Sequence, residues 1–137
     1  MMEPYNLEEK VERWTVELRK GTLELYVLTV IHRSPTYGAK VCRRLYELTE
    51  GSLDLKAGTL YPILRRLEEG GWIDGKLVEC REGEKGPGRK IYQLTSTGKQ
   101  LLNSMIAKMA EAIKALFKAY DRDVDELEKI FSLLSEF

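Results

Sequence analysis

Apolar residues recur every three or four positions through most of the chain, a spacing typical of amphipathic helices. The first such segment covers residues 7–20 and follows Asn6, which stands three residues before Glu9 as in a capping box. Gly21 is expected to end this helix. Its apolar stripe consists of Leu7, Val11, Trp14 and Leu18.

Two further helices are predicted next. Thr22 can cap a helix over residues 23–33, whose apolar positions go nearly all the way round, so that this helix should be central and buried. Thr36 can cap the following helix, over residues 37–50. The two helices are separated by the Ser-Pro pair at residues 34–35, which cannot continue the first of them.

Residues 56–72, KAGTLYPILRRLEEGGW, have the pattern of a fourth helix. Pro62 leaves two starting points open. If Thr59 is the N-cap, the proline falls in the first turn, where its missing N–H costs nothing. If the helix begins at Ala57, one hydrogen bond is lost. The predicted inner face consists of Leu60, Ile63, Leu64 and Leu67.

After the fourth helix the pattern changes to short, partly alternating segments. GKLVECREG and RKIYQLT read as two strands, and GEKGPG between them is rich in turn residues. The third and fourth helices are short and follow a buried helix, which is the layout of a helix-turn-helix. The predicted fold is therefore mainly α with a small β-hairpin, a winged helix-turn-helix.

The last section predicts a long amphipathic helix over residues 96–120, a break at residues 121–123 and a short final helix. The long helix has more apolar surface than one small domain can bury, which indicates a dimer interface; packing within one chain is the alternative. We expect residues 1–95 to form the DNA-binding domain and residues 96–137 a dimerisation segment. The expected interface consists of Leu101, Met105, Met109, Ile113, Leu116 and Tyr120.

Composition excludes several classes of function. Lys plus Arg and Asp plus Glu number 22 each, but residues 38–99 carry 12 basic and 9 acidic side chains, which weakly favours nucleic acid. One histidine and two separated cysteines give no catalytic or metal-binding constellation, so we expect no enzyme, metal or cofactor. Apolar runs are too short for a membrane span, and the first residues lack a signal-peptide core, so the expected location is the cytoplasm.

Three blocks of the sequence resemble the PadR family of transcriptional regulators: LRKGTLELYVLTVI, GTLYPILRRLEEGGWI and GPGRKIYQLTSTG. They keep the order and spacing found in that family. The resemblance implies a homodimer that binds operator DNA through the winged helix, with dimerisation through the C-terminal segment. The chain departs from the family in having Tyr-Gly-Ala at residues 37–39 and Lys-Ala-Gly at residues 56–58.

On a helical wheel, the face opposite Leu60 begins with Gly58 and Pro62 and continues with Arg65, a shape suited to the major groove. Arg65 can bridge the two acceptors of guanine. A solvated face and an ordinary hairpin loop are the alternatives, and a protein-interaction module is the alternative function. The predicted DNA-contacting residues are Lys56, Thr59, Tyr61, Arg65 and Arg66 on the helix, and Lys85, Arg89 and Lys90 on the wing.

Some relatives of the PadR family bind aromatic or drug-like compounds between the dimer helices. Trp14, Met105 and Met109 are the residues here that could line such a cavity, since methionine adapts to varied ligands. A plain dimer core is the alternative for the same three residues. The expected partners are double-stranded DNA and a second copy of the chain, with no membrane; a small aromatic or drug-like effector is a further partner only if these three residues line a cavity.

Overall fold

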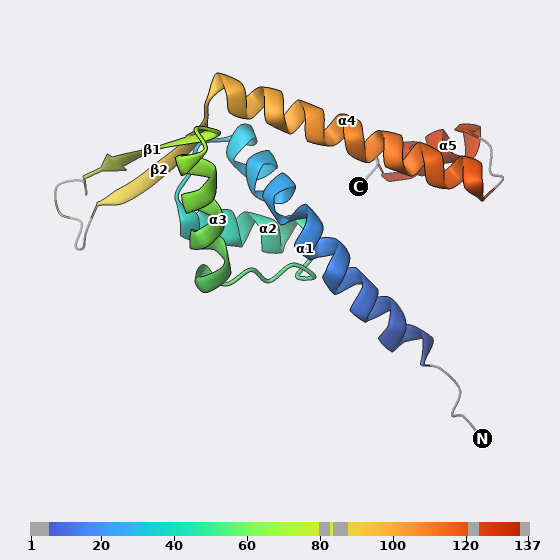
Figure 1. The fold of residues 1–137 in the computed structure, drawn as a ribbon. Helices are drawn as coiled ribbons and strands as arrows, with labels where there is room; N and C mark the ends of the chain where they lie inside the picture. The colour runs from blue at the N-terminus through green and yellow to red at the C-terminus, as the bar shows by residue number, and fades with distance from the viewer. Residues whose placement is uncertain (1–5, 80–82, 84–87, 121–123, 135–137) are drawn as a thin grey trace. The chain divides into compact units, whose positions relative to one another are not determined.

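The computed structural model describes residues 6–79, 83, 88–120 and 124–134. Contacts divide the chain into two units, Met1–Leu102 and Asn103–Phe137. The described part of the chain holds five helices and one two-stranded antiparallel sheet (Figure 1). The elements are α1 (Leu7–Arg33), α2 (Gly38–Leu48), α3 (Ala57–Glu69), β1 (Ile73–Val78), β2 (Arg89–Leu94), α4 (Ser96–Ala119) and α5 (Val124–Leu134).

Helix α1 is one continuous helix, so the predicted break at Gly21 is wrong. A Cβ at Gly21 would meet nothing within 4 Å, and α1 continues through Gly21 without the positive φ that favours glycine. The Thr22 hydroxyl donates to the carbonyl of Leu18 at 2.9 Å, a bond within the helix, and does not cap a new one. A glycine costs about 1 kcal/mol in a helix interior, which the buried second half of α1 offsets.

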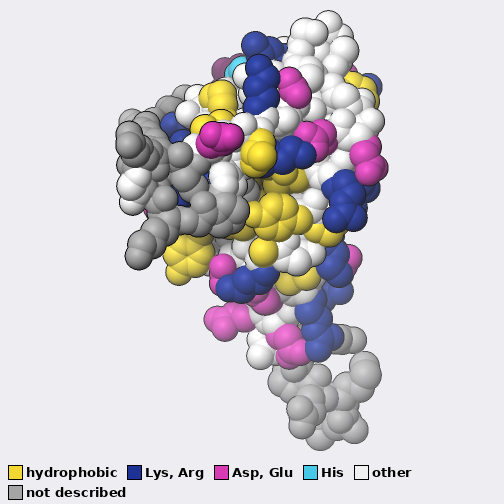
Figure 2. All heavy atoms as spheres, turned by 90° about the vertical axis from the view of Figure 1, so that its left-hand side faces the viewer, with side chains coloured by type: hydrophobic (Ala, Val, Ile, Leu, Met, Phe, Trp, Pro, Cys, Tyr) yellow, Lys and Arg dark blue, Asp and Glu magenta, His cyan; other side chains and the backbone are white. Residues whose placement is uncertain are grey.

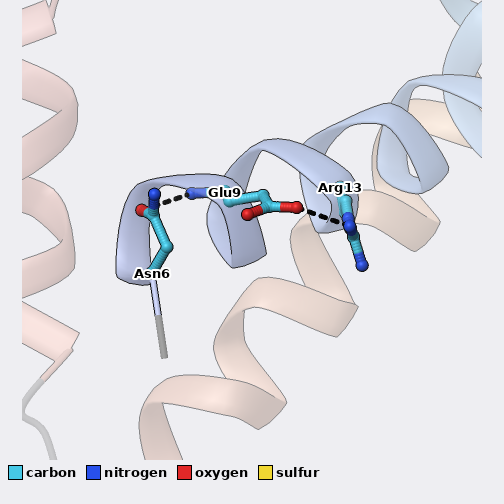
Figure 3. Close-up of polar contacts among 3 residues, drawn as sticks. All are labelled: Asn6, Glu9 and Arg13. Carbon is cyan, nitrogen blue, oxygen red and sulfur yellow. Dashed lines mark hydrogen bonds and ion pairs between the residues drawn. The ribbon is translucent and has the colours of Figure 1, made fainter. Parts of the chain in front are cut away.

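The predicted cap at the start of α1 is confirmed (Figure 3). The backbone N–H of Glu9 donates to the side-chain oxygen of Asn6 at 3.1 Å. The reciprocal half of a capping box is replaced, because the Glu9 carboxylate instead forms an ion pair with Arg13, one turn further along. The exposed first half of α1 therefore begins with a satisfied amide group and a paired charge.

The core of the first unit forms where the second half of α1 meets α2, α3 and the hairpin. Helix α1 supplies Val27, Leu28, Val30 and Ile31, all at most 1% exposed, which confirms the expected central position of residues 23–33. The other fully buried side chains are Val41, Leu45, Leu60, Leu64 and Ile73.

Helix α2 starts one residue later than predicted, with Tyr37 and not Thr36 as the N-cap. Thr36 is 3% exposed and pairs with Tyr92 of β2. Its N–H donates to the Tyr92 carbonyl at 3.1 Å, and its carbonyl accepts the Tyr92 N–H at 2.9 Å. Thr36 thus extends the sheet beside β2, which ties the start of α2 to the wing.

Helix α3 begins at Ala57, with Lys56 as the N-cap, which decides between the two starting points that Pro62 left open. The amides of Thr59 and Leu60 both donate to the Lys56 carbonyl at 3.0 Å. Pro62 therefore lies past the first turn, where its ring nitrogen has no hydrogen to donate to the Gly58 carbonyl.

The end of α3 has the hydrogen bonds of a Schellman motif. The N–H of Trp72 donates to the Leu67 carbonyl at 2.9 Å, and that of Gly71 to the Glu68 carbonyl at 3.0 Å. Gly71 has a φ of 77°, which favours glycine. The chain then enters β1, and the predicted hairpin is confirmed, with Ile73 opposite Leu94 and Val78 opposite Arg89.

Helix α4 begins directly after β2, at a junction held by Thr95. The Thr95 hydroxyl accepts the N–H of Gly98 at 3.0 Å and donates to the Gly71 carbonyl at 2.7 Å. The backbone N–H of Thr95 donates to the carbonyl of Trp72 at 3.1 Å. Gly98 is buried and packs so closely that an added Cβ would overlap the Trp72 carbonyl oxygen.

The two predicted C-terminal helices are confirmed as α4 and α5. The predicted break between them, residues 121–123, lies outside the described residues. Several apolar side chains of α4 are exposed in the single chain, among them Ile106 at 49% and Leu116 at 68%, as is Tyr120, directly after the helix, at 73%. No described helix is long and apolar enough to span a membrane.

Candidate nucleic-acid interface

The inner and outer faces of α3 differ as the sequence predicted. Leu60, Ile63, Leu64 and Leu67 are at most 4% exposed and hold the helix against the core. Gly58, Thr59, Pro62 and Arg65 are exposed. The outer face therefore begins with small residues and continues with a guanidinium group, which allows the backbone to approach a surface closely before a long side chain reaches out.

Lys56, at the N-terminal end of α3, pairs with Asp54. Its ammonium group lies 2.9 Å from a carboxylate oxygen, while 76% of the lysine side chain stays exposed. The hydrogen bond that Lys56 donates to the Asp54 carboxylate raises the pKa of Lys56, so the lysine is charged at any physiological pH. An exposed pair of this kind contributes little to stability and is easily exchanged for another anion.

Tyr61 is half exposed and packs against the first residue of α2. A Cβ at Gly38 would lie 2.9 Å from the Tyr61 hydroxyl oxygen and 3.0 to 3.1 Å from ring atoms. Gly38 is buried, so its missing side chain is what lets the ring cross the start of α2. Tyr61 therefore helps to set how α2 and α3 pack, in addition to presenting a hydroxyl group near the α3 N-terminus.

The two adjacent arginines of α3 have different surroundings. Arg66 directs its Nε towards Glu24 of α1, at 3.9 Å from a carboxylate oxygen, with both side chains largely exposed. Arg65 lies on the outer face with no such acidic neighbour described. Of the two, Arg65 is better placed to reach a ligand in front of α3.

Of the three basic residues predicted for the wing, the structure describes two, and these two have different neighbours. Lys85 lies outside the described residues. The guanidinium carbon of Arg89 lies 4.4 Å from the ring centroid of Tyr37, the N-cap of α2. The ammonium group of Lys90 lies 2.6 Å from a Glu68 carboxylate oxygen, so both described cations at the base of the wing contact the helix-turn-helix.

Basic side chains do not form one continuous patch among the described residues on the face in Figure 2. Lys and Arg side chains there alternate with acidic and apolar ones. This agrees with a formal net charge of zero for the whole chain. Attraction for a polyanion would therefore have to come from individual cations that approach it closely, more than from a broad positive surface potential.

The sequence profile of the transcriptional regulator PadR-like family matches residues 27–104, more than half of the chain. The chain belongs to the PadR-like family of transcriptional regulators. The match covers α1 from its buried half onward, α2, α3, the wing and the start of α4. The fold predicted from the sequence, a winged helix-turn-helix, is therefore confirmed.

Individual PadR-like proteins agree with this assignment. The chain is 31% identical over 98 residues to the transcriptional regulator YqjI of Escherichia coli, a match covering 69% of this chain and 44% of the regulator. It resembles the crystal structure of a PadR family regulator from Eggerthella lenta, with 28% identity, a TM-score of 0.70, and coverage of 85% and 96% of the two chains. A PadR-like transcription factor from Bacteroides fragilis gives 30% identity and a TM-score of 0.65, over 78% and 98%.

The sequence prediction did not include three residues of this PadR-like interface. They are Glu68, Gly75 and Tyr37, the neighbours of the basic wing residues. Glu68 and Lys90 are 22 residues apart, so no helical spacing relates them. Gly75, the first residue of a predicted strand, was the available signal, since a glycine in a strand often marks close approach of other groups.

The predicted effector residues are distributed over the two units. Trp14 is 60% exposed on α1, and Met105 and Met109 lie on α4 beyond Leu102. The effector pocket therefore stays a prediction. A separate open pocket of about 450 Å³ lies between the ends of α1 and α2, lined by Val30, Arg33, Ser34, Arg44, Glu47 and Leu48.

Metal-ligating side chains are not clustered in the described part of the chain. No group of three or more His, Cys, Asp or Glu residues could hold a metal ion there. Burial raises the pKa of the Cys42 thiol, which lowers its thiolate fraction and its reactivity. The family to which the chain belongs is one of transcriptional regulators.

Proposed function

We propose that the chain is a homodimeric transcriptional repressor that binds a palindromic operator through α3 and the wing. The observation that carries this proposal is the two-sided α3, with four buried apolar residues behind and an exposed face of Gly58, Pro62 and Arg65 in front. Membership of a family of transcriptional regulators supports DNA as the partner.

In this proposal the N-terminal end of α3 enters the major groove. Arg65 reaches the guanine edge of one base pair in each half-site, since its guanidinium group can donate two parallel hydrogen bonds. Thr59, Tyr61 and Lys56 contact phosphate oxygens near the helix start, and Arg66 contacts phosphate from the flank. The Lys56 ammonium exchanges Asp54 for phosphate as the complex forms.

The wing supplies a second contact in the same proposal. Lys85 and Arg89 follow the phosphate backbone beside the minor groove, and Lys90, the third predicted wing cation, is paired with Glu68 of α3. Arg89 already lies against Tyr37, and an arginine stacked on a ring keeps donors at its edge available.

Two symmetric copies would read the two halves of a palindrome about one helical turn apart. The proposed dimer interface joins the exposed stripe of α1 with the apolar face of α4. Leu7, Trp14 and Leu18 are 74, 60 and 44% exposed in the single chain, which is unusual for residues on one helical stripe. A second copy would cover them.

The charge balance favours one other candidate, a winged helix that binds a protein. A formal net charge of zero and the mixed face in Figure 2 are less basic than many DNA-binding domains. Such a module would show no DNA affinity that falls steeply with salt. Selection of bound fragments from the source genome by the purified protein tests both. Recovery of one palindromic motif supports binding to an operator, recovery of random fragments contradicts it, and recovery of no DNA supports the protein-binding module.

Lys85→Ala is expected to weaken binding to operator and random DNA by a similar factor, because a phosphate contact does not depend on sequence. The slope of log K against log salt should fall by about 1. Fluorescence anisotropy at several salt concentrations measures both quantities. Lys118→Ala, which removes the same charge from α4, is the control, and an equal loss in both variants would contradict a specific wing contact.

Leu116→Glu is expected to convert the dimer to a monomer without unfolding the chain, because Leu116 is 68% exposed in the single chain. Sedimentation equilibrium measures the association, and circular dichroism the helix content. Ala107→Glu adds the same charge to an exposed position on the opposite side of α4 and should leave the dimer intact. A Leu116→Glu variant that stays dimeric would place the interface elsewhere.

A further inference from the structure

The two described cations at the start of β2 point to opposite faces of the hairpin. Arg89 and Lys90 are neighbours in the strand, so their side chains alternate, one towards Tyr37 and the other towards α3. Lys90 lies on the same face as buried Tyr92, and its ammonium group is 5.6 Å from the centroid of that ring. The Lys90 ammonium is therefore directed inwards, to the last turn of α3.

The partner of Lys90 is the carboxylate of Glu68. The two groups lie 2.6 Å apart, and 44 and 31% of the two side chains stay exposed. The hydrogen bond that Lys90 donates to the Glu68 carboxylate raises the pKa of Lys90, so the lysine stays charged at neutral pH. Glu68 stands one turn after Arg65 on α3, so this contact joins the wing directly to the helix that carries Arg65.

Gly75 of β1, opposite Tyr92 in the sheet, makes this contact possible. A Cβ at Gly75 would lie 2.6 Å from a carboxylate oxygen of Glu68 and 3.1 Å from a ring carbon of Tyr92, and would overlap the Lys90 side chain. Lys90 and Glu68 thus meet across a position that glycine alone leaves open. Three elements, β1, β2 and α3, together build the contact.

We infer that Lys90 is a positioning residue, which fixes the wing relative to α3 through its contact with Glu68, and not a DNA-contacting residue. This inference rests on the proposed function, since it concerns how the DNA-binding surface is held. The Lys90 and Glu68 side chains are 44 and 31% exposed, against 76 and 56% for Lys56 and Asp54. Lys90 is therefore less free to exchange its carboxylate for a phosphate. A half-exposed ion pair adds little to global stability, so its effect is on the orientation of the wing.

Exchange of the two charges tests this inference. Operator binding is compared by anisotropy for the wild type, Lys90→Glu, Glu68→Lys and the double variant carrying both changes. Each single variant should bind the operator about fivefold or more weakly, and the double variant should recover to within about twofold of the wild type. Melting temperatures should differ little among the four, because the pair is at the surface.

A matched control separates restored contact from restored net charge. Lys76 is exposed on β1 and faces the opposite side of the hairpin from Lys90. Glu68→Lys should not rescue Lys76→Glu, although this pair of changes has the same net charge as the exchange. Rescue in both pairs would overturn the inference, since it would show that only total charge matters.

A neutral change gives a second, independent readout. Lys90→Met should lower operator affinity but leave the slope of log K against log salt unchanged, whereas loss of a phosphate contact lowers that slope by about 1. A lower slope, or no rescue in the exchanged double variant, overturns the positioning role while the wild type still binds DNA. A wild type that binds no DNA overturns the proposed function and this inference together.

Discussion

Replacement of Gly98 with alanine is expected to lower the free energy of unfolding by about 3 kcal/mol, the upper part of the range for overpacked positions. The added methyl group would overlap the carbonyl oxygen of Trp72. That carbonyl is backbone and accepts the N–H of Thr95, so it cannot rotate away as a flexible side chain could. Relief requires α4 to shift or the junction after β2 to open. Urea denaturation followed by circular dichroism measures the change.

Gly21→Ala is the matched control for this prediction. Gly21 also lies inside a helix, but a Cβ there meets nothing within 4 Å. The same substitution should therefore raise the free energy of unfolding by about 0.5 to 1 kcal/mol, through helix propensity alone. Similar values for the two variants would show that the close packing of Gly98 against Trp72 does not hold in solution.

Arg65→Ala is the second substitution with a large expected effect. On the proposed operator it should cost about 1 to 3 kcal/mol per half-site and relax the preference at one base pair, because a bidentate contact with guanine is lost. Binding to random DNA should change far less. Anisotropy titrations against the operator, against operators altered at single positions and against random DNA measure these quantities.

Arg66→Ala provides the comparison, since it removes the same charge from the next residue. The Arg66 side chain points towards Glu24 of α1. Its loss should therefore weaken binding to operator DNA and to random DNA by a similar factor, smaller than the loss of operator binding expected for Arg65→Ala. If Arg65→Ala also reduced binding to both DNAs equally, Arg65 would be a phosphate contact, and the base-reading role proposed for it would be wrong.

The inner face of α3 could be predicted from sequence because burial there depends on local periodicity. Leu60, Ile63, Leu64 and Leu67 follow the helical spacing and all prove buried. The hairpin was predictable for a similar reason, since turn residues separate two short strands. In both cases the signal lies within about a dozen neighbouring residues.

Predictions that rested on one residue's conformational preference were less reliable. Gly21 was expected to end a helix, yet α1 continues through it because tertiary packing outweighs a cost of about 1 kcal/mol. Thr36 was expected to be a cap, and instead pairs with Tyr92, 56 positions later in the sequence. A local pattern contains no information about such a distant partner.

The surroundings of the predicted DNA-contacting residues were the feature hardest to predict from the sequence. Lys85, Arg89 and Lys90 look alike as charges near glycines. The fold gives Arg89 the ring of Tyr37 and Lys90 the carboxylate of Glu68. The helix-turn-helix residues that receive these two cations lie more than 20 positions before them, so only the three-dimensional arrangement distinguishes their roles.

The continuity of α1 has a consequence for the half-site spacing that the proposed dimer would accept. A 27-residue helix is a rod about 40 Å long, and its buried end is anchored beside α2 and β2. A second copy docked on the exposed end would therefore be held at a fixed distance from the reading helix, with no joint at Gly21 to absorb a change. In the proposed dimer, α1 would fix the distance between the two reading helices, and operators with one base pair added between the half-sites should bind weakly.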